Sequence, residues 1–174
     1  LFIDWFIVSF LSLLYWIIAG KYLTRAEYGI VSTSTNLILV LSSVSLLGLN
    51  IAVWKLIPEY LAKKQNGKVL NLVRFSLLVG LFVSFLLAAS IIFLSPFLSQ
   101  IFKFTSKVVL TTALSLIVVS LAYYFQYILY GFQNMRLIAL ADLFGNITKV
   151  IISALLIFLG FGLFGLLLGF SFSF

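Results

Sequence analysis

The chain has 174 residues, of which 64% are hydrophobic and only 9% are charged. A soluble domain is about half apolar and about a quarter charged, so this composition excludes a soluble fold. The apolar residues extend along the whole length, which also excludes a soluble domain with one membrane anchor. The net charge of +7 does not indicate a partner nucleic acid, because the basic residues lie between apolar segments and form no continuous stripe.

The sequence offers little for catalysis or metal binding. It contains no cysteine, no histidine and only four acidic residues. It has no acidic pair at helical spacing and no glycine-rich phosphate loop. We therefore expect no enzyme, no cofactor and no metal site. The acidic residues are Asp4, Glu27, Glu59 and Asp142.

Four segments lack Asp, Glu, Lys and Arg, and each exceeds the roughly 20 residues that a helix needs to cross the hydrocarbon core. Their apolar residues do not alternate, so they predict helices and not barrel strands. We predict an all-α, polytopic bundle: an N-terminal transmembrane lobe of six helices over residues 1–174, the last one truncated. The charge-free segments are 28–54, 75–102, 108–135 and 150–174. The predicted helices are 2–19, 30–54, 69–94, 108–131, 137–159 and 162–174.

Shorter features lie between these helices. A polar turn at residues 20–29 separates the first two helices. In a helix over residues 55–65, apolar residues would lie on one face and charged residues on another, which predicts a short amphipathic helix in the membrane interface. Pro96 predicts the end of the third helix, because proline removes a helical hydrogen bond.

The C-terminal part allows two interpretations. Gly160 and Gly162 could form a turn between two helices, or residues 150–174 could be one span. We favour two helices, because otherwise residues 132–149, rich in Leu, Ile, Ala and Phe, would be an unusually apolar loop. The chain starts with Leu and stops inside an apolar run, so we expect it to be a fragment of a longer protein.

The basic residues predict the orientation, because Lys and Arg are enriched in cytoplasmic loops. The side with more of them is expected to be cytoplasmic, which places the N-terminus there in a multi-pass protein of the cell membrane. That side carries Lys55, Lys63, Lys64, Lys68, Arg74 and Arg136, and the other carries Lys21, Arg25, Lys103 and Lys107.

Polar residues recur along the second predicted helix. Ser32, Asn36, Ser43 and Asn50 are spaced by four, seven and seven residues, which places them on nearly one line of a helix. Such a stripe packs against a neighbouring helix through hydrogen bonds or lines a wet cavity. Asn36 and Asn50 are therefore candidate cavity residues.

The fifth predicted helix carries Asp142, Asn146, Lys149 and Ser153 on one face. A charge at mid-bilayer costs about 2.5 to 3.5 kcal/mol, so such groups face a cavity or pair with each other. Asp142 and Lys149 are two turns apart, about 10.5 Å, too far for a direct bridge unless Asn146 relays it. We expect Lys149 to attract an anionic head group and Asp142 to tune it or carry a proton. If 150–174 were one span, Lys149 would be an interfacial lysine.

Two further features have simpler interpretations. Tyr123, Tyr127 and Tyr130, with Gln126 nearby, form a stripe that is typical of an aromatic belt at the interface, although stacking on a sugar is an alternative. Arg74 lies more than one turn inside the third helix, where snorkelling to the headgroups accounts for it.

Several segments together resemble the N-terminal half of the polysaccharide (O-antigen) flippases, which belong to the multidrug, oligosaccharidyl-lipid and polysaccharide exporter superfamily. The resemblance covers nearly the whole chain in order and spacing. It departs at Thr24 and Arg25, where the family commonly has Gly and Pro. The segments are YLTRAEYG at 22–29, LGLNIA at 47–52, YLAKK at 60–64, YGFQN at 130–134 and GFGLFG at 160–165.

The resemblance implies two six-helix lobes around a central cavity, with the C-terminal half of the same chain as the second lobe. It implies a flippase that moves polyprenyl-diphosphate-linked glycan across the cell membrane by alternating access, in contact with membrane lipids and with glycosyltransferases or a polymerase of the same pathway. Lys149, Arg136 and Arg74 are then candidates for binding the diphosphate. The alternatives are a cation-coupled multidrug antiporter that uses Asp142 and a non-transporting membrane component of polysaccharide assembly.

Overall fold

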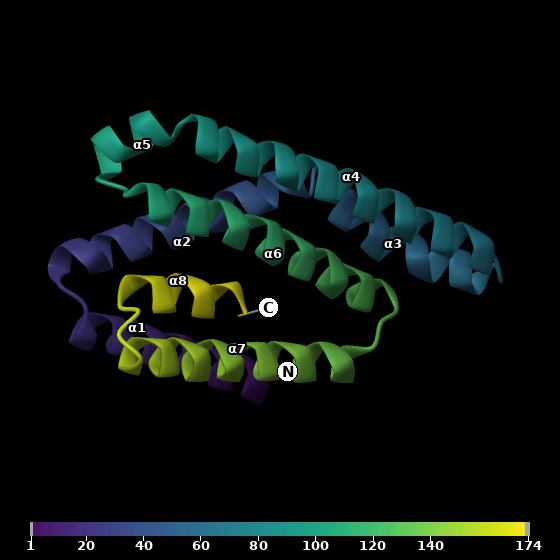
Figure 1. Ribbon diagram of the computed structural model, residues 1–174. Coiled ribbons are helices and arrows are strands. Elements are labelled where there is room, and N and C mark those ends of the chain that lie inside the picture. The colour runs from purple at the N-terminus through teal and green to yellow at the C-terminus, as the bar shows by residue number, and fades with distance from the viewer. Residues whose placement is uncertain (1, 173–174) are drawn as a thin grey trace.

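The computed structural model describes residues 2–172, with side chains from residue 6 onward, so the side chain of Asp4 and residues 173–174 lie outside it. The described residues form helices and no strand, which confirms the all-α prediction. The long helices lie side by side and run back and forth along one common direction (Figure 1). The helices are α1 (Phe2–Tyr22), α2 (Arg25–Ser45), α3 (Leu49–Ala62), α4 (Asn66–Phe93), α5 (Ser95–Phe102), α6 (Ser106–Gly131), α7 (Met135–Phe158) and α8 (Leu163–Ser171).

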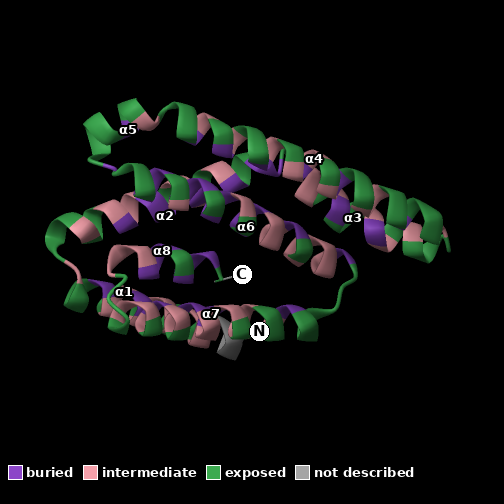
Figure 2. Cartoon of the chain, in the orientation of Figure 1, coloured by how far each residue is buried: buried purple, intermediate pink, exposed green. Residues whose placement is uncertain are grey.

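Among the described residues, four helices are long and apolar enough to cross a membrane: α2, α4, α6 and α7. The outer faces of the bundle carry large apolar side chains, such as Phe85, 58% exposed, and Phe93, 86% exposed. Buried residues line the inner faces of the helices and exposed residues the outer ones (Figure 2). A bundle that is apolar outside suits lipid as its solvent.

The prediction of one helix over residues 30–54 is wrong. Helix α2 ends at Ser45, and α3 begins at Leu49. Between them Leu47 has φ 47° and Gly48 has φ 74°, and these left-handed conformations cannot continue a right-handed helix. The segment 55–65, predicted as a separate amphipathic helix, is instead the second half of α3 and the turn after it.

Pro96 has a second role that the sequence analysis missed. The third predicted helix does end before it, since α4 stops at Phe93. The same proline then lies in the first turn of α5, where its missing N–H costs nothing. The eight residues of α5 had not been predicted as a helix.

The C-terminal part consists of two helices, α7 and α8, which is the interpretation that the sequence favoured. The alternative of one span over residues 150–174 is wrong. Gly160 and Gly162 have φ of 86° and 52°, which turns the chain back after α7. Helix α8 then packs closely on α7: a Cβ added at Gly169 would overlap the Ser153 hydroxyl and lie 3.0 Å from the Ser153 backbone nitrogen.

The helices α2, α4 and α8 all pack against α6. Small residues allow the close approach, since Gly80 of α4 lies against the buried ring of Tyr124. Hydroxyl pairs link other helices: the hydroxyl oxygens of Ser45 on α2 and Ser120 on α6 lie 3.0 Å apart at hydrogen-bond distance, and Ser171 of α8 donates to Ser115 at 2.7 Å. Small and hydroxyl-bearing residues of this kind are typical of helix contacts in membranes.

Candidate functional site

A cavity of about 480 Å³ lies between α1, α2, α6, α7 and the end of α8. Apolar and aromatic side chains, among them Trp16 and Leu39, form part of its wall. Its polar lining comes from four helices that are distant in sequence. We call it the Lys149 cavity, and its polar residues are Ser12, Thr35, Asn36, Gln126, Asp142, Asn146 and Lys149.

The polar stripe of α7 faces inward as predicted. Asn146, Lys149 and Ser153 are buried, and Asp142 is half-buried. Lys149 is only 5% exposed. It lies about 21 Å along α7 from Met135, close to the middle of this candidate span. The interpretation of Lys149 as an interfacial lysine at the start of a span is therefore wrong.

The ammonium group of Lys149 has neutral partners. It donates to Oδ1 of Asn146 at 2.7 Å and to Oγ of Ser12 on α1 at 3.2 Å. The ring of Tyr15, also on α1, has its centroid 5.6 Å from the nitrogen. These contacts satisfy two of the three N–H donors and add a cation–π interaction.

Asn146 connects Lys149 to Asp142 only through the backbone. Its Nδ2 donates to the main-chain oxygen of Asp142 at 2.8 Å. The Asp142 carboxylate accepts instead from Nε2 of Gln126 on α6, also at 2.8 Å. The amide relay between the two charges thus exists, but it ends on a carbonyl oxygen and not on the carboxylate.

Among the described residues, no carboxylate forms an ion pair with Lys149. A buried charge without an opposite charge is costly, and it is tolerated where it faces water or an oppositely charged ligand. Lys149 therefore presents to the cavity a buried positive charge that no direct ion pair neutralises, while the carboxylate of Asp142 belongs to the same lining.

Of the other predicted site residues, the structure brings Asn36 to this cavity and places Asn50, Arg74 and Arg136 outside it. Asn36 lines it, but Asn50 lies beyond the break at Gly48, on α3, so the predicted line of four polar residues is interrupted. The buried serines of α2 are Ser34, Ser42 and Ser45. Arg74 and Arg136 are exposed, on α4 and at the start of α7, and neither lines the cavity.

Three residues of the cavity were not predicted to interact with Lys149 or Asp142. Ser12 and Tyr15 are three residues apart on α1 and so share a face, but nothing in the sequence indicates that this face meets α7. Gln126 was noted only for its closeness to the tyrosine stripe of α6. In that stripe, the rings of Tyr127 and Tyr130 lie 5.9 Å apart.

Comparison with known proteins agrees with the resemblance in the sequence. The family described as polysaccharide biosynthesis protein matches residues 3–174. A search of curated proteins and a search of solved structures each gave no match. The chain, a membrane protein by its long apolar helices, therefore belongs to the polysaccharide biosynthesis protein family, and its role lies in the synthesis or export of polysaccharide.

Proposed function

We propose that this chain is the N-terminal lobe of a flippase that moves a lipid-diphosphate-linked oligosaccharide across the cell membrane. One observation supports the proposal most: Lys149 is buried at mid-helix with only neutral partners. A diphosphate would give Lys149 a direct anionic partner with several acceptor oxygens, and charge-assisted hydrogen bonds of this kind are strong.

The remaining lining suits the sugar part of such a ligand. Asn36, Gln126 and Asn146 supply amide groups that both donate and accept hydrogen bonds, as sugar hydroxyls do. Trp16 and Tyr15 supply aromatic surface beside them. The volume of about 480 Å³ falls within the range of about 300 to 1,000 Å³ that is usual for ligand pockets.

Transport would follow by alternating access. The C-terminal half of the full-length protein would supply a second lobe, and the two lobes would open the cavity alternately to each side of the membrane. The N-terminus would be cytoplasmic. This orientation places the turn between α3 and α4, with Lys63, Lys64 and Lys68, in the cytoplasm, in accord with the positive-inside rule.

A cation-coupled drug antiporter fits the cavity less well. Such a protein needs a carboxylate that is available to an organic cation or a proton, and Asp142 is its candidate. The Asp142 carboxylate accepts a hydrogen bond from Gln126. The more buried charge of the cavity is the ammonium of Lys149, which repels cations.

The test replaces Lys149 with methionine in the full-length protein, which removes the charge and keeps an unbranched side chain. Purified protein is titrated with geranylgeranyl diphosphate, and with geranylgeraniol as the uncharged control ligand. A hydrogen bond to a charged group contributes about 1.5 to 3 kcal/mol, so we expect Lys149→Met to weaken diphosphate binding by about ten-fold or more. Binding of geranylgeraniol should not change.

Lys107→Met is the matched control, because Lys107 is an exposed lysine outside the cavity. Cells that carry each variant are also assayed for surface polysaccharide. We expect Lys149→Met to reduce it strongly at equal protein level, and Lys107→Met to leave it normal. Diphosphate binding that survives in Lys149→Met would refute the role of Lys149. Drug resistance that depends on Asp142 would favour the antiporter. Normal polysaccharide assembly in cells, together with no translocation of the lipid-linked oligosaccharide in proteoliposomes, would favour a non-transporting component.

A further inference from the structure

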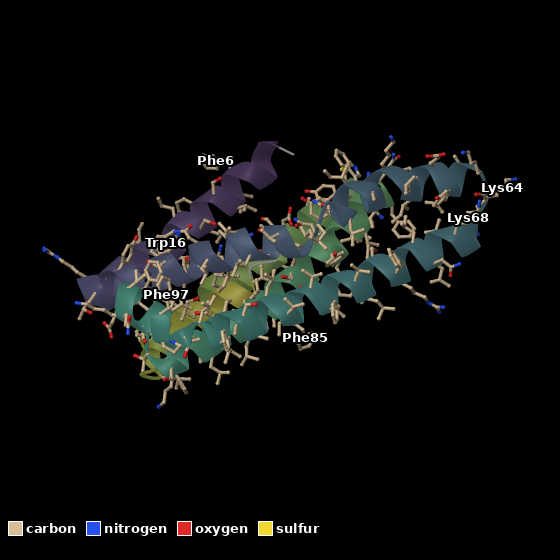
Figure 3. The ribbon with its side chains drawn as sticks, turned by 90° about the horizontal axis from the view of Figure 1, so that it is seen from above. Phe6, Trp16, Lys64, Lys68, Phe85 and Phe97 are labelled. Carbon is tan, nitrogen blue, oxygen red and sulfur yellow. The ribbon has the colours of Figure 1, made fainter. Side chains whose placement is uncertain are left out.

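A second feature of the molecule lies outside the Lys149 cavity. Helix α3, the first turns of α4 and the turn between them form a hairpin, residues 49–74, which we call the basic hairpin. It extends past the end of α6, and Lys64 and Lys68 lie at its tip, far from Phe97 on α5 (Figure 3). Its five cationic side chains and one carboxylate, all exposed, give a net charge of +4. They are Lys55, Lys63, Lys64, Lys68, Arg74 and Glu59.

Not all of these cations are equally available. Lys63 forms an ion pair with Glu59, with 2.6 Å between nitrogen and oxygen. Lys68 lies over the ring of Tyr60, 5.9 Å from its centroid, and Lys64 forms no ion pair within the described part of the chain. The unneutralised charge at the tip therefore belongs to Lys64 and Lys68.

The length of α4 places this tip at the membrane surface. The charge-free part of α4, from Phe75 to Phe93, is about 28 Å long, close to the roughly 30 Å of the hydrocarbon core. Residues 66–74, with Lys68 and Arg74, then lie at the level of the lipid headgroups.

An apolar groove opens at the same level, between α3, α4 and the end of α6. It has a volume of about 420 Å³. Its wall includes the exposed side chains of Leu61, Leu70 and Phe132, and its polar member is Asn66. Asn66 lies two residues from Lys64 and two residues from Lys68 in the sequence, so both lysines belong to the end of the hairpin where the groove has its polar residue.

We propose that this groove binds an anionic phospholipid, with an acyl chain along the apolar wall and the phosphate near Lys64 and Lys68. The occupant follows from depth and charge: the groove lies where acyl chains meet headgroups, and the end of the hairpin beside it carries the positive charges of Lys64 and Lys68. Clusters of lysine next to a membrane span attract anionic lipid, and each lysine contributes about a five-fold gain in affinity. This site does not depend on the proposed transport function.

The experiment uses the full-length protein in detergent micelles and a fluorescent dioleoylphosphatidylglycerol as the probe. Lys64→Gln/Lys68→Gln is compared with Lys103→Gln/Lys107→Gln at the turn between α5 and α6. The pairs are closely matched, because all four lysines are exposed and Lys64 and Lys103 have the same left-handed backbone, with φ of 55° and 54°. We expect the affinity for dioleoylphosphatidylglycerol to fall about thirty-fold in Lys64→Gln/Lys68→Gln and to stay unchanged in Lys103→Gln/Lys107→Gln.

A second pair of variants tests the groove itself. Leu70→Trp fills part of the groove, whereas Phe75→Trp changes an exposed position of the same helix outside it. We expect only Leu70→Trp to weaken lipid binding. Equal losses in the two lysine pairs, equal binding of dioleoylphosphatidylcholine, or equal effects of the two tryptophan variants would each overturn the proposal.

Discussion

The ammonium group of Lys149 on α7 donates a hydrogen bond to the hydroxyl of Ser12 on α1, across 3.2 Å and 137 residues of sequence. This bond and the contact with Tyr15 join the first helix to the charged stripe of α7. Helix α1 packs mainly on α7 and makes little contact with α2. The position of the first helix is therefore coupled to the charge in the cavity.

Replacing Ser12 with alanine should destabilise the protein by about 0.6 to 1.7 kcal/mol, the range measured for hydrogen bonds between membrane helices. Reversible unfolding in mixed micelles, followed by tryptophan fluorescence, measures this change. Ser9→Ala is the control, because Ser9 is exposed on the same helix and does not line the cavity. An equal loss in both variants would show that the bond to Lys149 contributes nothing.

Replacing Gly80 with alanine should weaken the contact between α4 and α6. The added Cβ would overlap the ring of Tyr124, so either the helices separate or the buried ring moves. Overpacking of this kind costs about 1 to 3 kcal/mol. Gly67→Ala in the same helix meets no atom within 4 Å and, since alanine favours helix, should leave stability unchanged or slightly raised. Thermal unfolding in detergent compares the two, and equal melting temperatures would contradict the prediction.

The hydroxyl pair of Ser45 and Ser120 should show a measurable coupling energy. A double-mutant cycle with Ser45→Ala and Ser120→Ala should give about 0.6 kcal/mol, the average for hydrogen bonds between membrane helices. Ser43 is exposed and donates to Leu39 of its own helix, so a cycle with Ser43→Ala and Ser120→Ala should give no coupling. Similar values in the two cycles would exclude a specific bond between α2 and α6.

Replacing Glu59 with glutamine should strengthen the binding of anionic lipid to the basic hairpin. The hydrogen bond and charge of Lys63 lower the pKa of Glu59 below its usual value, so Glu59 is ionised at neutral pH and neutralises Lys63. Glu59→Gln raises the hairpin charge from +4 to +5 and should tighten phosphatidylglycerol binding about five-fold at pH 7.

The same substitution gives a pH test with a defined sign. Because the pKa of Glu59 is lowered, its ion pair persists above that pKa and is lost as the pH falls through it. The wild type should approach the affinity of Glu59→Gln only in that acidic range. Glu27→Gln, at the opposite end of α2, where Glu27 caps the helix with Thr24, should not change lipid binding. An effect of Glu27→Gln equal to that of Glu59→Gln would contradict a local role of the ion pair.

The membrane character and most of the helices could be predicted from the sequence alone. Long segments without charge leave a helix as the only way to satisfy the backbone in lipid, so α4, α6 and α7 were predicted to within a few residues. The break at Leu46–Gly48 could not be predicted, because apolar residues continue across it and a single glycine is compatible with a helix interior. The small helix α5 was missed because Pro96 was interpreted only as a stop signal.

The face of α7 that carries Asp142, Asn146 and Lys149 was also determined by the sequence, because helical periodicity reports which residues share a face. Only the tertiary structure decided what that face meets. Ser12, Asn36 and Gln126 come from three other helices, α1, α2 and α6. The packing of these helices depends on contacts such as that of Ser45 with Ser120, which no periodicity reveals. A polar residue on a membrane helix can satisfy its side chain at the membrane interface, against a neighbouring helix or in a cavity. The sequence does not distinguish these environments, so only the packing showed that Asn50, Arg74 and Arg136 lie outside the cavity.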